Sequence, residues 1–144
     1  MVRVTEVQRE QWEKEGYLRY LGERDDVREL LAIADLVVLT SYWEGTPRAL
    51  LEAAAMSTPI VTSDAPGCRE VVDHGTTGFL VPPKNIEVLC QSMENLILNS
   101  DLRDRFGQAA RKKAELEFDE KVVIAQFLRI YDRLLTTEPQ NSTP

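Results

Sequence analysis

The feature that most constrains the fold is a strand-to-helix junction across residues 36–56. Residues 36–41 (LVVLTS) are mostly apolar and rich in leucine and valine, a composition typical of a buried parallel strand. Residues 47–56 are rich in helix-forming residues, with Pro47 suited to the first helical position and Thr46 to the N-cap. A helix that follows a buried strand so closely predicts an α/β fold with a parallel sheet.

Two glutamates eight positions apart lie at this junction. Glu44 follows the strand, and Glu52 is expected about a turn and a half into the helix. Ligands of open α/β sheets bind at the carboxyl ends of the strands, where a helix N-terminus attracts anions and carboxylates accept hydrogen bonds from hydroxyls. The pattern predicts a nucleotide sugar as ligand. The alternatives are an ion pair between Glu52 and a nearby arginine, and a helix-capping role for Glu44.

The rest of the chain alternates strands and helices and then becomes helical. Strands are predicted at residues 18–21, 36–41 (as the central strand), 60–63 and 79–81. Helices are predicted at 2–15, 25–34, 47–56, 67–73, 86–99, 102–118 (capped by Asp101) and 120–136 (capped by Asp119). Residues 138–144 read as a disordered tail.

The composition limits the kinds of function that are expected. The length of 144 residues fits one domain, and the net charge of −7 argues against nucleic acid and anionic membrane surfaces as partners. No membrane span and no signal peptide are expected. Cys68 and Cys90 lack metal-ligand spacing and read as reduced thiols, which favours a cytoplasmic protein. The only histidine, His74, lies in a polar turn and is expected to be structural.

Several motifs together carry a family resemblance. The string EGTPRALLE, with YLGERDDVRELLAIADLVVLTSYWEG before it and TPIVTSDAPGCREVVDHGTTGFLVPP after it, resembles the nucleotide-sugar-binding domain of retaining glycosyltransferases of the GT-B fold, family 4 type. The resemblance covers residues 17–135 and is strongest to bacterial enzymes of capsule, O-antigen and lipid-linked oligosaccharide synthesis. It implies a Rossmann-like parallel sheet with flanking helices, as part of a GT-B carboxyl-terminal domain.

The resemblance also implies roles for the two glutamates and their neighbours. Glu44 is expected to contact the donor sugar at the reacting ring, as the catalytic residue, and Glu52 to hold the ribose hydroxyls. Gly45 is expected to allow close approach of the backbone, and Thr46 to offer an amide at the helix start.

Two arginines are further candidates for donor binding. Arg48 is expected near the diphosphate, with a surface position or an ion pair as the alternative. Arg24, in the loop after Gly22, is expected to contact the base, with an ordinary turn as the alternative. The donor is expected to be a UDP-sugar, with no metal and no other cofactor.

Some family features are missing. The first strands, a basic pair for the diphosphate and the acceptor domain are not found, and Ser57-Thr58 stands where a glycine-containing helix end is usual. We therefore expect a polar segment (1–16), a partial nucleotide-sugar-binding domain (17–136) and a tail (137–144). Transfer would need an acceptor domain or subunit, so the isolated chain is expected to be inactive.

Three further expectations complete the interpretation. The chain would self-associate through an exposed sheet edge near residues 18–21 and 36–41. It would reside in the cytoplasm, at the inner face of the membrane through its acceptor. The alternative functions are a non-catalytic nucleotide-sugar-binding or regulatory module, a subunit of a split transferase, and an epimerase, which the single His74 argues against.

The last predicted helix carries an apolar stripe. Its members recur at helical spacing: Val122, Val123, Phe127, Ile130, Tyr131, Leu134 and Leu135. Two interpretations stay open. The stripe packs on its own domain, or it crosses to another domain, as the last helix does in the family.

Overall fold

The computed structural model describes residues 4–136, so the predicted tail at 138–144 lies outside the described residues. Three parallel strands, β1 (Val37–Leu39), β2 (Ile60–Ser63) and β3 (Gly78–Val81), form one sheet in the order β1-β2-β3. Val37 lies opposite Ile60, and Ile60 opposite Gly78. The α/β class, the parallel pairing and three of the four predicted strands are confirmed.

The predicted central strand is wrong in its position and in its burial. β1 is an edge strand of the described sheet and β2 is its centre, because β1 pairs on one side only within residues 4–136. All of β2 is buried, whereas Val38 of β1 is partly exposed.

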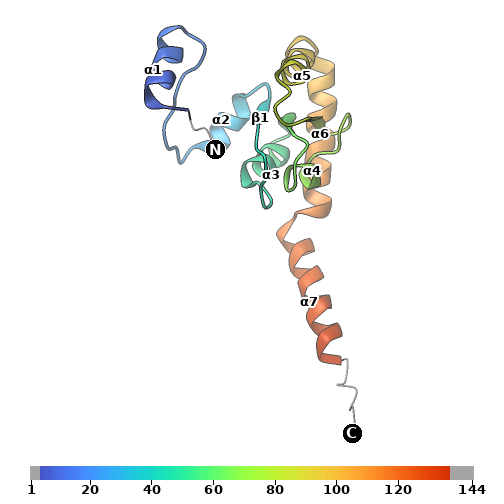
Figure 1. Ribbon diagram of the computed structural model, residues 1–144. Coiled ribbons are helices and arrows are strands. Elements are labelled where there is room, and N and C mark those ends of the chain that lie inside the picture. The colour runs from blue at the N-terminus through green and yellow to red at the C-terminus, as the bar shows by residue number, and fades with distance from the viewer. Residues whose placement is uncertain (1–3, 137–144) are drawn as a thin grey trace.

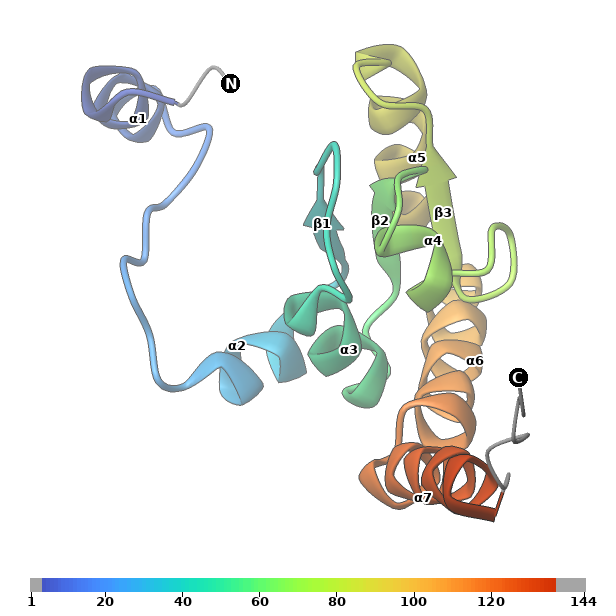
Figure 2. The same ribbon diagram turned by 60° about the horizontal axis from the view of Figure 1, so that its bottom comes forward.

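Residues 18–21 form no strand. Tyr20 instead donates its backbone N–H to the carboxylate of Glu13 at 2.6 Å. A strand forms only where a neighbour completes its hydrogen-bond ladder, and Figure 2 shows this segment running well apart from β1.

Helices cover both faces of the sheet (Figures 1 and 2). On one face lie α2 (Val27–Ile33), α3 (Arg48–Ala55) and α4 (Cys68–Val71), and on the other lies α5 (Ile86–Leu98). The long α6 (Ser100–Glu117) contributes Ala110 to the first core and Phe106 to the second. Side chains of successive strand residues alternate between faces, which is why Ile60 belongs to the α3 core and Val61 to the α5 core.

Two helices stand apart from this body. α1 (Glu6–Lys14) is joined to α2 by an extended segment, and α7 (Glu120–Thr136) projects from the end of α6 (Figure 1). Neither helix contains a buried residue. The interpretation that the apolar stripe of α7 packs wholly on its own domain is therefore wrong for this structure. Val122 and Val123 are half-buried, and the stripe is exposed from Phe127 onward.

Most helix boundaries agree with prediction to within about two residues, which is the usual uncertainty of helix ends. α6 is an exception in its cap: Asn99, not Asp101, accepts the N–H of Leu102 at 3.0 Å. At the end of α3, Ser57 has φ 59°, in the left-handed region that glycine adopts more easily. This geometry suits the glycine-containing helix end that the resemblance leads us to expect here.

Candidate donor-binding site

Glu44 is held in the loop between β1 and α3. The Ser41 hydroxyl donates to Glu44 Oε1 at 2.6 Å, and the Glu44 N–H donates to the Pro66 carbonyl at 3.0 Å. Gly67 (φ 87°) packs so closely that a Cβ there would overlap the Gly45 carbonyl oxygen. Glu44 is therefore positioned by contacts with the next βα loop, and it does not cap α3, so the capping alternative is wrong.

The start of α3 differs from the prediction by one position. Pro47 is the N-cap and Arg48 the first helical residue, so Thr46 is not the cap. The proline has no side-chain hydrogen-bond acceptor, and no side chain caps the helix. The first N–H groups of α3 are consequently available to an anion.

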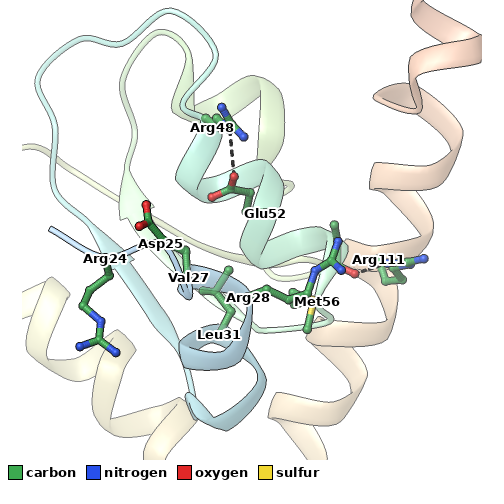
Figure 3. A pocket seen from close by; sticks show the side chains of 10 residues that line it. Arg24, Asp25, Val27, Arg28, Leu31, Arg48, Glu52, Met56 and Arg111 are labelled. Atoms are coloured by element: carbon green, nitrogen blue, oxygen red, sulfur yellow. Dashed lines mark hydrogen bonds and ion pairs between the residues drawn. The ribbon is translucent and has the colours of Figure 1, made fainter. Parts of the chain in front are cut away.

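Glu52 forms an ion pair one turn along α3. Arg48 Nε donates to Glu52 Oε1 at 2.9 Å (Figure 3), with the two side chains 90% and 38% exposed. Exposed pairs of this kind contribute only about 0–1 kcal/mol. The structure thus contains the ion-pair alternative, but the pair is weak enough for a ligand to replace it.

A groove of about 730 Å³ runs beside this pair. Its lining residues come from α2, α3, α6 and the loop before α2: Arg24, Asp25, Val27, Arg28, Leu31, Arg48, Glu52, Ala55, Met56 and Arg111. Four arginines face two carboxylates here, although the whole chain has a net charge of −7. Three of these arginines form ion pairs, Arg24 with Asp26, Arg48 with Glu52 and Arg111 with Glu115. An anionic ligand would therefore replace carboxylates that these arginines already bind.

Arg24 lines the groove but is directed elsewhere. Its Nε donates to Asp26 Oδ1 at 2.7 Å, and in Figure 3 its guanidinium points away from the Arg48–Glu52 pair. The hydrogen bond between the two side chains raises the pKa of Arg24 and lowers the pKa of Asp26. In this structure the loop therefore presents Asp25, rather than the head group of Arg24, toward α3 (Figure 3).

The structure brings together only some of the predicted residues. Arg24, Arg48 and Glu52 line the groove, whereas Glu44, Gly45 and Thr46 lie in the loop before α3, outside its lining. Arg28 and Arg111 were missed. Arg28 could have been found from the sequence, since it follows the candidate loop on a predicted helix. Arg111 could not, because its contact with the Ala55 carbonyl joins residues 56 positions apart.

Two other predicted residues are structural. Cys68 is fully buried in the α3 core. His74 Nδ1 accepts the N–H of Leu80 at 3.1 Å, and its ring lies against Phe79. Within residues 4–136, no group of three or more His, Cys, Asp or Glu side chains could hold a metal ion, and no helix is long and apolar enough to cross a membrane.

Comparison with known proteins decides the family. The model of the family described as glycosyl transferases group 1 matches residues 4–113. The chain belongs to this family. It is 37% identical over 120 residues to the N,N'-diacetylbacillosaminyl-diphospho-undecaprenol alpha-1,3-N-acetylgalactosaminyltransferase of Campylobacter jejuni, covering 83% of this chain and 32% of that protein.

Two solved structures agree with the fold. HepE of Anabaena, solved in complex with UDP, superposes with a TM-score of 0.81 and 28% identity, covering 88% of this chain and 35% of that one. The carboxyl-terminal domain of LpcC from Francisella tularensis shares the fold, with a TM-score of 0.67 and 20% identity over 79% of this chain and 62% of that one. The GT-B assignment is thus confirmed. The chain spans about a third of the length of the curated relatives it matches.

Proposed function

We propose that this chain is the donor-binding part of a retaining glycosyltransferase. The observation that carries the proposal is the groove, which four arginines line and in which Glu52 lies about one turn beyond the uncapped start of α3. A nucleotide sugar matches both features, because its diphosphate is anionic and its ribose hydroxyls can donate hydrogen bonds to a carboxylate. HepE, which was solved with UDP-glucose as well as with UDP, supports a UDP-sugar as donor.

In this proposal each element has a physical role. Glu52 exchanges its weak bond to Arg48 for bonds from the ribose hydroxyls, and Arg48 is then released toward the diphosphate. When the bond between sugar and diphosphate breaks, negative charge grows on the leaving group, and the arginines and the N-terminus of α3 stabilise it. Glu44 accepts a hydrogen bond from a hydroxyl of the donor sugar and so fixes the orientation of the sugar for transfer.

The acceptor and its site are also part of the proposal. The name of the Campylobacter relative describes a diphospho-undecaprenol acceptor, and this relative is about three times longer than the matched region. We propose a lipid-linked saccharide acceptor at the inner face of the membrane, bound by a separate domain or subunit. We also propose that residues 17–136 form the donor-binding part and that residues 1–16 are a separate preceding segment.

Substitution of Glu52 tests the donor site. Glu52→Ala and Glu52→Gln should weaken UDP binding by about 1–3 kcal/mol, because a charged hydrogen-bond acceptor is lost. Glu44→Ala should leave UDP binding unchanged and weaken only the UDP-sugar. Titration calorimetry of the three variants measures both effects.

Glu117→Ala is the matched control. Glu117 also ends an i, i+4 ion pair, with Lys113 at 3.8 Å, but it lies on α6 outside the groove. Its removal should not change UDP affinity. Equal UDP affinity of the wild type and Glu52→Ala would reject the assignment of Glu52.

A further inference from the structure

A second, smaller pocket lies at the carboxyl ends of the three strands. Its volume is about 180 Å³. The lining residues come from the strand ends, the loops that follow and the start of α5: Thr40, Tyr42, Ser63, Val81, Pro82, Lys84, Asn85, Ile86 and Leu89. Lys84 is their only charged member, in a chain whose net charge is −7. A lining with one lysine and no carboxylate favours an anion.

This pocket is separate from the arginine groove. The two share no lining residue. The groove lies along α3, whereas the pocket is bounded by Val81 and Leu89, which belong to the core on the α5 face. The two sites thus lie on opposite faces of the sheet, and one small ligand does not fill both.

Ser63 contributes a hydroxyl group to the pocket. The residue is only 4% exposed, and its side chain forms no hydrogen bond with another of residues 4–136. The hydroxyl is therefore available to a ligand in the pocket.

Lys84 is held in an unfavourable backbone conformation. Its φ of 66° lies in the left-handed region, where side chains with a Cβ are uncommon. Its Nζ lies 5.6 Å from the centre of the Tyr42 ring, and it forms no ion pair within the described residues. Strained positions of this kind concentrate at functional sites. The backbone thus holds beside the pocket an ammonium group that has no carboxylate partner within residues 4–136.

We propose that this pocket binds the phosphate group of a substrate other than the nucleotide. Lys84 neutralises the phosphate, and the hydroxyls of Ser63 and Thr40 donate to its oxygens. The volume has room for several water-sized groups, since one water occupies about 30 Å³. Tyr42 and Glu44 belong to one loop, so the phosphate lies near the proposed sugar site. The assignment to a phosphate of the acceptor, whose saccharide part the separate domain or subunit would hold, rests on the proposed function.

Titration of the full chain with inorganic phosphate, followed by amide NMR, tests the site. Phosphate should shift the resonances of Ser63, Val81 and Lys84 in a saturable way. Lys84→Gln should weaken the affinity about tenfold, as expected for loss of a charged partner. Lys112→Gln removes the same charge from an exposed position on α6 and should leave the affinity within about twofold. Equal effects of the two substitutions would overturn the proposal.

Lys84→Gly separates binding from folding. Glycine adopts the left-handed conformation without strain, so the midpoint of thermal unfolding should stay or rise while phosphate binding is lost. Retained phosphate binding in this variant would also overturn the proposal.

A phosphate titration in the presence of saturating UDP shows whether the pocket binds the donor diphosphate or the phosphate of another substrate. UDP should leave the phosphate-dependent shift of Ser63 in place, because the nucleotide binds on the other face. Displacement of phosphate by UDP would assign the pocket to the donor diphosphate and refute the proposal. The phosphate titration can be carried out without UDP. If the groove does not bind UDP, the UDP titration will show this, and the result of the phosphate titration will not change.

Discussion

Helices α3 and α7 are both amphipathic, yet they are used in opposite ways. α3 has eight residues and buries Leu50, Ala53 and Ala54 against β1 and β2. α7 has seventeen residues and buries none, with Leu135 83% exposed. The difference comes from the connections. α3 is tied at both ends to adjacent strands of the sheet, whereas α7 is joined to the body only through the end of α6.

This comparison bears directly on the site. Because one face of α3 is locked in the core, Arg48 and Glu52 on its other face keep a fixed position beside the groove. The stripe of α7 is instead exposed from Phe127 to Leu135. An amphipathic pattern therefore predicts that a helix has an apolar face, but not what covers that face.

The largest difference between the two helices is expected in hydrogen exchange. Core amides of α3 should exchange only on global unfolding, which costs about 5–15 kcal/mol in ordinary domains. Amides of Tyr131 to Leu135 should be protected by less than about 1 kcal/mol, because an isolated helix is marginal in water. Strong protection through Leu135 in a demonstrated monomer would show that α7 folds onto the body.

Alanine substitutions compare how much α3 and α7 contribute to the free energy of unfolding. Leu50→Ala removes a fully buried side chain and should lower the free energy of unfolding by about 2–5 kcal/mol. Leu135→Ala deletes the same atoms from an exposed position and should change it by no more than about 0.5 kcal/mol. Urea unfolding of both variants measures this, and similar losses would mean that α7 contributes to the core after all.

The smallest effect concerns self-association. The outer edge of β1 is unpaired within residues 4–136, and such edges recruit other strands. We expect the chain to self-associate, and Val38→Lys at this edge should weaken the association by about 1 kcal/mol or less. Sedimentation velocity across a concentration series measures it.

Ile33→Lys is the control for this prediction, since Ile33 is an exposed apolar residue on α2 rather than on the sheet edge. A chain that remains monomeric at high concentration would contradict the prediction. An equal effect of the two lysines would shift the contact away from β1.

Part of the site could be predicted from sequence because its signals are local. The spacing of Glu44 and Glu52 across a strand–helix junction located both residues near one edge of a parallel sheet. It did not locate Arg111, whose contact with the Ala55 carbonyl spans 56 positions, or the pocket at Ser63 and Lys84, whose parts come from three strand ends. No local pattern contains such juxtapositions.

The sequence by itself determined the class of the fold and its elements. Apolar periods of two and of 3.6 residues, with turn residues between them, indicate which segments have an apolar face as a strand and which as a helix. Only the tertiary structure decided that β2 is the central strand of the described sheet, that residues 18–21 form no strand, and that α7 buries no residue. These outcomes depend on a neighbour being available, and a segment's own residues do not encode where its neighbour lies.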